Sequence, residues 1–151
     1  SPFEIDGIKF NCAEQYMMYH KALHFGDQQT AAAIMATSDP KQQKYLGRTV
    51  KAFDSHIWDK VKIEIVTRGN YLKFSQNPAL KAKLLALGDS LLVEANPHDT
   101  VWRIGLPFYD PDARDPAKWG GTNYLGMILT GLKEAFRCER PQANAVLAPT
   151  I

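Results

Sequence analysis

The sequence predicts an α+β fold, in which a mainly helical single domain packs around a small β-sheet. Its length of 151 residues, with 45% hydrophobic and 23% charged residues, suits one globular core. Several long segments place apolar residues at helical spacing, whereas the strand-like runs are short and do not alternate with helices as in a βαβ array. The sequence contains no repeat and no long linker that would separate two domains.

The first half of the chain is predicted to form a hairpin followed by three helices. An Asp6-Gly7 turn between two short apolar segments is typical of a β-hairpin. Gly26 and Gly47 stand where they could end helices, and Asp27 stands where it could cap one. We therefore expect helices over residues 13–25, 27–36 and 39–46.

A longer helix is predicted in the middle of the chain. Apolar residues from Trp58 to Leu72 recur at spacings of 3, 4 and 7, with lysines and glutamates on the other faces. This pattern indicates an amphipathic helix within residues 55–74. A short helix is expected to follow over residues 78–87.

The last third of the chain is predicted to contain two strands and one helix. The run SLLVEA over residues 90–95 is typical of a buried strand, and residues 100–106 could pair with it. Either Thr122 or Asn123 could cap a final helix, whose apolar residues repeat at helical spacing. The tail over residues 138–151 is expected to be irregular.

The composition excludes several classes of protein. The net charge of +2, from 18 Lys and Arg against 16 Asp and Glu, is too small for a general nucleic-acid binder but leaves a nucleotide-sized anionic ligand open. No apolar run approaches the roughly 18 residues of a membrane span, and we see no signal-peptide pattern, so we expect a cytoplasmic protein without a membrane partner. Its two cysteines, Cys12 and Cys138, allow neither a disulfide framework nor a cysteine-rich zinc site.

Motifs of the common cofactor and metal enzymes are missing from the sequence. It contains no G-x-G-x-x-G, no P-loop, no G-x-S-x-G and no H-E-x-x-H. His20 and His24 could share a helix face, but two imidazoles without a third ligand make a poor metal site, so we favour surface or packing roles for them. We therefore expect neither a metal nor a cofactor.

A charged pair stands on an apolar stripe of the first predicted helix. Glu14 and Lys21 lie seven residues apart, two helical turns, and share that stripe with Met18 and Phe25. One interpretation is that both side chains extend from the core to solvent. The other is a site, because a lysine in apolar surroundings loses proton affinity and can act as a nucleophile, with a carboxylate to hold it or move its proton.

A second cluster of polar residues follows the predicted strand at 90–95. Glu94 lies within that run, and Asp99 and Trp102 come in the loop behind it, where binding residues often lie. The alternative is structural, with Asp99 as a cap and Trp102 in the core. Trp58 could likewise be a core residue or stack on a planar base, and Arg48 could be a surface charge or a phosphate contact.

Four spaced motifs then indicate a family. They are CAEQYMMYHKA over residues 12–22, LGR over 46–48, LVEANPHDTVWRIGL over 92–106 and WGGTNYLG over 119–126. In this order they resemble the NADAR, or YbiA-like, family. The resemblance implies the YbiA-like α+β fold and a catalytic domain over residues 1–137. It also implies a cytosolic, metal-free N-glycosidase, because members cleave ribosylamino pyrimidine intermediates of riboflavin synthesis or remove ADP-ribose from modified guanine.

The resemblance assigns roles to individual residues. It implies that Glu14, Lys21, Glu94 and Asp99 are the catalytic candidates. The candidate substrate-binding residues are Trp58, Trp102, Arg48, Gly105 and Asn123, together with Arg103, which is a candidate for its charge and not from the family pattern.

Three positions depart from the family pattern. Asn96, Arg103 and Gly121 stand where members usually have Ser, Gly and Gln. Arg103 adds a long cation, which either favours a diphosphate ligand or points outward.

The substrates that the resemblance implies share a ribose C1 bonded to an exocyclic amine, and this bond can be cleaved in two ways. In the closed-ring route, Glu94 and Asp99 would act as an acid and an opposing carboxylate. In the open-ring route, Lys21 would form a Schiff base with the sugar, Glu14 would tune its amine, and Asp99 would carry protons to the departing base.

We therefore predict an N-glycoside hydrolase that removes ADP-ribose from guanine, as in DNA repair, with the ribosylaminopyrimidine phosphate of riboflavin biosynthesis as the alternative substrate. The partner is then an ADP-ribose-containing or ribosylamine phosphate substrate, free or within ADP-ribosylated DNA or RNA. A module that only binds ADP-ribose or NAD, or an interaction domain without a pocket, would need no reactive lysine. The sequence leaves the oligomeric state open.

Overall fold

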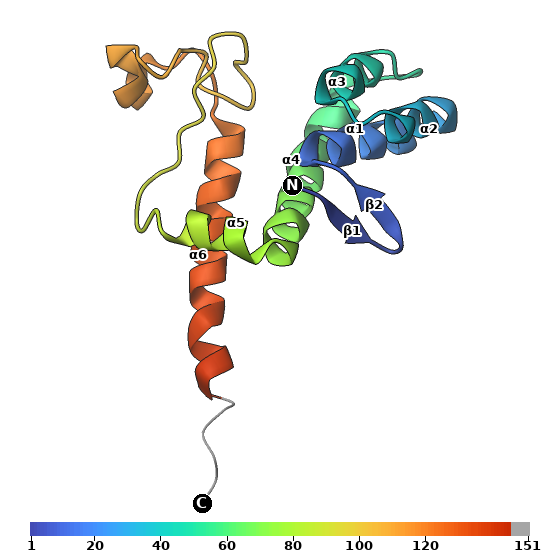
Figure 1. Cartoon of the computed structure of the whole chain (residues 1–151). Coiled ribbons are helices and arrows are strands. Elements are labelled where there is room, and N and C mark those ends of the chain that lie inside the picture. Colours follow the sequence, from blue (N-terminus) through green and yellow to red (C-terminus); the bar gives the residue numbers. More distant parts are fainter. Residues whose placement is uncertain (146–151) are drawn as a thin grey trace, which may run out of the picture. The chain divides into compact units, whose positions relative to one another are not determined.

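The structure is a computed structural model that describes the backbone of residues 1–145 and the side chains of residues 1–139. Helices dominate the described residues, and one two-stranded antiparallel sheet accompanies them, so the predicted α+β class is confirmed (Figure 1). The chain divides into two compact units, residues 1–81 and 82–151, and the predicted catalytic domain over residues 1–137 stays a prediction. The division falls within a helix, so no Gly-rich or Pro-rich linker marks it in the sequence.

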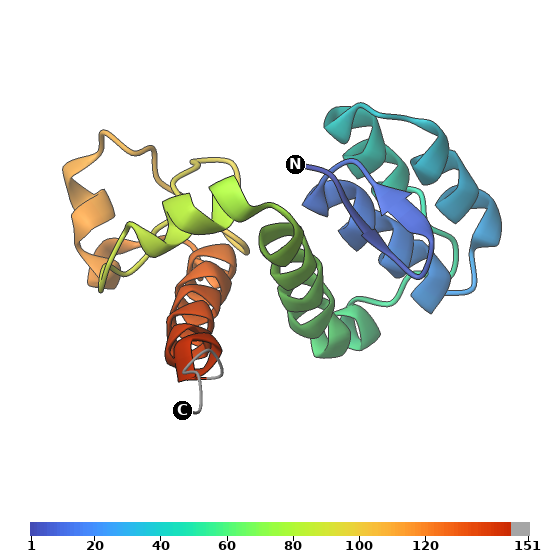
Figure 2. The same cartoon turned by 60° about the horizontal axis from the view of Figure 1, so that its bottom comes forward.

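Unit 1 is a bundle of four helices with a hairpin against it. The hairpin packs on the first and fourth helices (Figure 2). Phe3 and Phe10 of the hairpin form one buried cluster with Tyr16 of the first helix, and a second cluster around Met18 and Ile34 fills the space between the first three helices. The elements are β1 (Phe3–Ile5), β2 (Ile8–Phe10), α1 (Ala13–His24), α2 (Gln28–Ala36), α3 (Pro40–Arg48) and α4 (Ser55–Gln76).

The predicted hairpin and the first helix boundaries are confirmed. Asp6 and Gly7 both take positive φ, as a two-residue hairpin turn requires. Gly26, with φ of +73°, ends α1, where its amide donates to Leu23 and the next amide donates to Ala22. The side chain of Asp27 accepts a hydrogen bond from a backbone amide in the first turn of α2, as expected of a cap.

Gly47 is not the helix stop that the sequence predicts. It lies inside α3, which ends one residue later. A Cβ at this position would lie 1.9 Å from the sulfur of Met18, so the glycine lets α3 approach α1 closely. A glycine near a helix end can either end the helix or allow close packing against a neighbouring helix. At Gly47 close packing is the reason.

Gly69 provides a test of this close packing. A Cβ on this residue of α4 would lie 2.5 Å from a ring carbon of the buried Tyr16. We expect Gly69→Ala to destabilise the protein by about 1 to 3 kcal/mol, even though alanine favours helix more than glycine does. Gly131→Ala is the matched control, because nothing lies within 4 Å of its Cβ position, and it should stabilise by up to about 1 kcal/mol. Urea unfolding of both variants measures the difference, and equal effects would contradict the packing argument.

Unit 2 contains one long helix and an irregular segment that runs along it. The buried face of the helix carries Ile128, Leu132 and Phe136, in agreement with the predicted stripe. Lys133 is also buried there, and its amine donates to the backbone carbonyl of Ser90. The elements are α5 (Pro78–Leu85), which begins in unit 1, two 3₁₀ turns, η1 (Pro111–Arg114) and η2 (Pro116–Lys118), and α6 (Tyr124–Ala145).

The predicted strand at residues 90–95 is wrong. This segment has no regular secondary structure and pairs with no strand in the described part of the chain. Its backbone bonds instead to side chains of α6 and the residue before it, because Leu92 donates to Thr130 and Glu94 donates to Asn123. A single backbone hydrogen bond, from Ile104 to Glu94, connects it with the segment predicted as its partner.

The predicted irregular tail is also wrong for its first part. Helix α6 continues through Ala145, with Pro141 inside it. Proline removes one hydrogen bond from a helix, but good helix formers such as Gln142 and Ala143 continue beyond it. Residues 146–151 lie outside the described residues.

No helix that the structure describes is both long enough and apolar enough to cross a membrane.

Candidate active site

In unit 1, the amine of Lys21 lies against two aromatic rings. Its Nζ is 4.4 Å from the centre of the Phe53 ring and 5.8 Å from that of Trp58. Trp58 is 9% exposed and belongs to the first turn of α4, whereas Phe53 lies in the loop before α4 and is 44% exposed. The two rings give a half-buried lysine an apolar environment that opens to solvent on the Phe53 side.

The charges around Lys21 act in opposite directions. Burial lowers the pKa of Lys21, the positive charge of Arg48 lowers it further, and the negative charge of Glu14 raises it. Arg48 is exposed at the end of α3, and one carboxylate oxygen of Glu14 is buried on α1. Because the lowering causes prevail, the fraction of neutral, nucleophilic amine is larger than for a lysine in water.

A buried polar network fixes the start of α1 and hence the position of Glu14. The side chain of Gln43 on α3 is fully buried, donates to Asn11 and to the carbonyl of Thr37, and accepts from the thiol of Cys12. Gln15 accepts from the amide of Asn11 and donates to two carbonyls at the end of α2. The network ties three helices together beside the predicted catalytic carboxylate.

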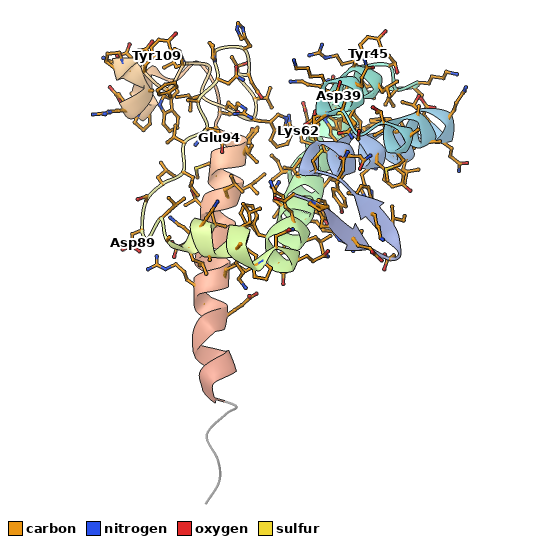
Figure 3. The ribbon with its side chains drawn as sticks, in the orientation of Figure 1. Asp39, Tyr45, Lys62, Asp89, Glu94 and Tyr109 are labelled. Carbon is orange, nitrogen blue, oxygen red and sulfur yellow. The ribbon has the colours of Figure 1, made fainter. Side chains whose placement is uncertain are left out.

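In unit 2, Arg103 contacts both predicted catalytic carboxylates. Its guanidinium donates to Glu94 at 3.1 Å, and its Nε lies 3.9 Å from an oxygen of Asp99. Figure 3 shows Glu94 beside the first turn of α6. The sequence analysis left open whether Arg103 contacts a diphosphate or points outward. In this structure its guanidinium contacts the side chains of Glu94 and Asp99 instead.

Asp99 also shapes the loop in which it lies. Its Oδ1 accepts hydrogen bonds from the backbone amides of Val101 and Trp102, at 3.0 and 2.9 Å. The structural alternative for Asp99 therefore has direct support, because the carboxylate closes a turn that places Trp102. The Trp102 ring is partly exposed and meets the edge of Tyr124, with ring centres 6.2 Å apart.

Asn123 and Gly105 hold the backbone of this unit. Asn123 is fully buried, has φ of +52°, accepts from the amide of Glu94 at 2.9 Å and donates to the carbonyl of Leu92 at 3.0 Å. Its side chain thus binds the 92–94 segment and does not cap the final helix, for which Asn123 was one of two predicted caps. Gly105 has φ of +74°, and a Cβ there would lie 3.3 Å from the carbonyl carbon of Gly120, so a turn and a close approach both account for glycine.

The structure thus groups the predicted residues into two clusters, each within one unit. Phe53 is the member that the sequence analysis missed, because it lies in a loop and belongs to no periodic pattern. Among the side chains that the structure describes, no three His, Cys, Asp or Glu residues gather as metal ligands would. The unit 1 cluster holds Glu14, Lys21, Arg48, Phe53 and Trp58, and the unit 2 cluster holds Glu94, Asp99, Trp102, Arg103, Gly105 and Asn123.

The fold and these clusters define a small helical α+β protein with a half-buried lysine of lowered pKa in one unit and a carboxylate pair in the other. Comparison with known families identifies it further. The NADAR domain matches residues 1–137, and the chain belongs to this family. The family predicted from the four motifs is therefore confirmed.

Individual relatives support the same placement. "N-glycosidase R617" of Acanthamoeba polyphaga mimivirus is 50% identical over 122 residues, which are 81% of this chain and 72% of that protein. "N-glycosidase YbiA" of Escherichia coli is 27% identical over 139 residues, 92% of this chain and 78% of YbiA. The NMR structure of E. coli YbiA superposes with a TM-score of 0.75, covering 93% of this chain and 75% of that one, so the YbiA-like fold is confirmed.

A third relative is a plant protein of another description. "Riboflavin biosynthesis protein PYRR, chloroplastic" of Zea mays is 32% identical over 135 residues, which are 85% of this chain. The match covers 20% of the maize protein. The similarity thus concerns one portion of a much longer chain.

Proposed function

We propose that this protein is an N-glycosidase that removes ADP-ribose from the exocyclic amine of guanine, with Lys21 as its nucleophile. The enzyme class follows from the family, since the mimiviral and E. coli relatives are named N-glycosidases, and it agrees with the class predicted from the sequence. The substrate and the role of Lys21 are the parts that experiment must test.

The observation that carries the proposal is the environment of the Lys21 amine. It lies against the rings of Phe53 and Trp58, and burial is the main cause that lowers its pKa. A lysine acts as a nucleophile only when neutral, so an apolar environment favours the reactive form. Nearby Glu14 supplies a carboxylate that can accept a proton from the attacking amine.

The proposed reaction proceeds through the open sugar. The C1–O4′ bond of the ribose breaks, O4′ takes a proton, and C1 forms an imine with the base nitrogen. The nitrogen of Lys21 adds to C1, and a proton passes to the base nitrogen. The C1–N bond to guanine then breaks, which leaves C1 joined to Lys21 as a Schiff base. Water hydrolyses this bond and returns the free amine and the open sugar, with no oxidation or reduction.

The closed-ring route has less support from the structure. It needs one carboxylic acid that donates a proton to the leaving base. Glu94 and Asp99, the predicted pair, both contact the guanidinium of Arg103, and Asp99 in addition accepts two backbone hydrogen bonds. These contacts use both carboxylates as hydrogen-bond acceptors, which suits a proton-donating role poorly.

The choice of substrate rests on smaller differences. The name of the 50% identical relative gives no substrate, and the relative named for riboflavin biosynthesis is more distant and matches over one fifth of its length. The exposed cation of Arg48 near Lys21 suits a phosphate, and the neighbouring rings suit a planar base. The ribosylaminopyrimidine phosphate, which offers one phosphate and a smaller base, is the second candidate.

Two substrates offered in parallel test the proposal. The protein is incubated with ADP-ribosylated guanosine and with ribosylaminopyrimidine phosphate, and the released base is followed by mass spectrometry. We expect faster release of guanosine, and ADP-ribosylated DNA and RNA oligonucleotides then show whether the base is accepted within a strand. If only the ribosylaminopyrimidine phosphate is cleaved, the riboflavin intermediate is the substrate and the proposed guanine substrate is wrong. Binding of ADP-ribose with no release from either would leave a binding module.

The two tryptophans are expected to differ in their effect on ligand binding. Trp102 is partly exposed, whereas Trp58 is almost fully buried. Trp102→Ala should therefore weaken ligand binding by about 1 to 3 kcal/mol if its ring stacks on a base, with little loss of stability. Trp58→Ala should mainly lower stability. Calorimetric titration with ADP-ribose and thermal unfolding of both variants measure this, and unchanged affinity in a folded Trp102→Ala protein would reassign that ring to packing.

A further inference from the structure

The loop that carries Phe53 has an unusual backbone conformation. It connects α3 with α4, and within it Ala52 has φ of +58°. Residues other than Gly, Asn and Asp rarely adopt this left-handed conformation, and it persists only where the surrounding structure imposes it. Such residues are more frequent at functional sites, so the side chain that this turn positions is a candidate for a functional role.

Contacts on both sides of Ala52 impose the turn. Val50 is buried in the core cluster with Met18, and the amide of Lys51 donates to the buried carboxylate of Asp27 at 2.9 Å. After the turn, Asp54 caps α4 through the amides of its first residues. The backbone is therefore fixed immediately before and after the strained residue.

The side chain that the turn presents is the Phe53 ring. Its face lies over the Lys21 amine at 4.4 Å, and its edge contacts Phe25, with ring centres 5.3 Å apart. Phe25 follows the end of α1, the helix that carries Lys21. The ring thus contacts both the amine and the residue that follows the helix bearing the amine, and it is itself 44% exposed.

We propose that Phe53 is a positioning residue for Lys21. Its ring covers the amine, keeps water from it and holds it beside Trp58, and the left-handed turn at Ala52 aims the ring. The inference rests on the proposed role of Lys21 in the reaction, but it makes a separate prediction about the amine itself.

The charged groups near Lys21 remain in place when the cover is removed. Arg48 on α3 and Glu14 on α1 are the charges that act on the amine, and neither belongs to the loop. Burial is the largest cause of the lowered pKa of Lys21. A substitution of Phe53 therefore changes the solvation of the amine while both neighbouring charges stay.

Competitive labelling measures this effect without any substrate. The protein reacts with a trace of acetic anhydride at a series of pH values, and peptide mass spectrometry gives the titration of each lysine. In Phe53→Ala we expect the apparent pKa of Lys21 to rise toward that of an ordinary lysine. Phe53→Leu keeps an apolar cover and should leave the pKa low. Tyr45→Ala removes an aromatic ring that is 61% exposed elsewhere on α3, and it is the matched control (Figure 3).

The turn is tested by two substitutions of Ala52. Glycine accepts a left-handed backbone, so Ala52→Gly should keep the Lys21 titration of the parent protein. A β-branched residue does not, so Ala52→Val should displace the ring and reproduce the titration of Phe53→Ala. Thermal unfolding of each variant shows whether it has folded before the labelling is interpreted.

The outcomes separate this inference from the proposed function. In turnover of ADP-ribosylated guanosine, Phe53→Ala should lose about tenfold in kcat with a smaller change in KM. An unchanged or lower pKa of Lys21 in folded Phe53→Ala would overturn the covering role. If instead the pKa rises as expected but Lys21→Ala retains full turnover, the cover is correct and the proposed chemistry is wrong.

Discussion

Lys21→Ala is expected to fold normally and to lose about a thousandfold in kcat, because the nucleophile of the proposed reaction is absent. The side chain is half-buried at the edge of the α1 stripe and makes ring contacts, so its loss should change stability little compared with activity. Lys21→Arg is the control that keeps the positive charge beside the rings but cannot form a Schiff base. Base release followed by mass spectrometry, together with thermal unfolding, gives both quantities. A kcat near that of the parent protein in either variant would remove Lys21 from the chemistry.

The same prediction has a direct chemical readout. Borohydride added during turnover should reduce the Schiff base and attach the sugar to the peptide that contains Lys21, and the enzyme should be inactivated only when substrate is present. Burial lowers the pKa of Lys21, and the neutral amine is the attacking form, so adduct formation should rise with pH and level off below the range of an ordinary lysine. An active enzyme that carries no adduct would favour direct displacement through Glu94 and Asp99.

Elements with a local chemical signal could be predicted from the sequence. The hairpin follows from the Asp6-Gly7 turn, and the start of α2 follows from the side chain of Asp27. These features depend on residues within a few positions of one another. Gly47 shows where such signals become ambiguous, because the sulfur of Met18, almost thirty residues earlier, decides what the glycine does.

The false strand at 90–95 has a different cause. Its run of apolar residues resembles a buried strand, but Leu91 and Val93 are exposed, and its backbone partners are side chains of Asn123 and Thr130. The spacing of apolar residues indicates which face of a regular element is buried. It does not show whether the backbone hydrogen bonds of a segment go to a neighbouring strand or to a side-chain amide such as that of Asn123. A segment held in this way cannot be distinguished from a strand without the tertiary structure.

The candidate site was predictable to the extent that it lies on helices. The seven-residue spacing of Glu14 and Lys21 placed them on one stripe of α1, and the charge of Glu14 does act on the amine. Phe53 could not be predicted, because its position depends on the left-handed turn at Ala52. Arg103 could not be assigned either, since its ion pair with Glu94 forms across nine residues of irregular chain.

Asn123→Ala should be the most destabilising substitution in unit 2. The Asn123 side chain satisfies two backbone groups of the 92–94 segment, the carbonyl of Leu92 and the amide of Glu94. Each buried group left without a partner costs about 1 to 3 kcal/mol, and alanine in a left-handed conformation adds about 1 kcal/mol. We therefore expect a total loss of about 3 to 7 kcal/mol in urea unfolding.

Asn123→Gly separates the two contributions. Glycine accepts the φ of +52° but also lacks the amide, so it should be more stable than the alanine variant by about 1 kcal/mol and still well below the parent protein. Because the 92–94 segment carries Glu94 to Arg103, both variants should also disturb that ion pair. If Asn123→Ala were within 1 kcal/mol of the parent protein, water would be replacing the amide, and the segment would have to be held by Thr130 and by the bond from Ile104 to Glu94.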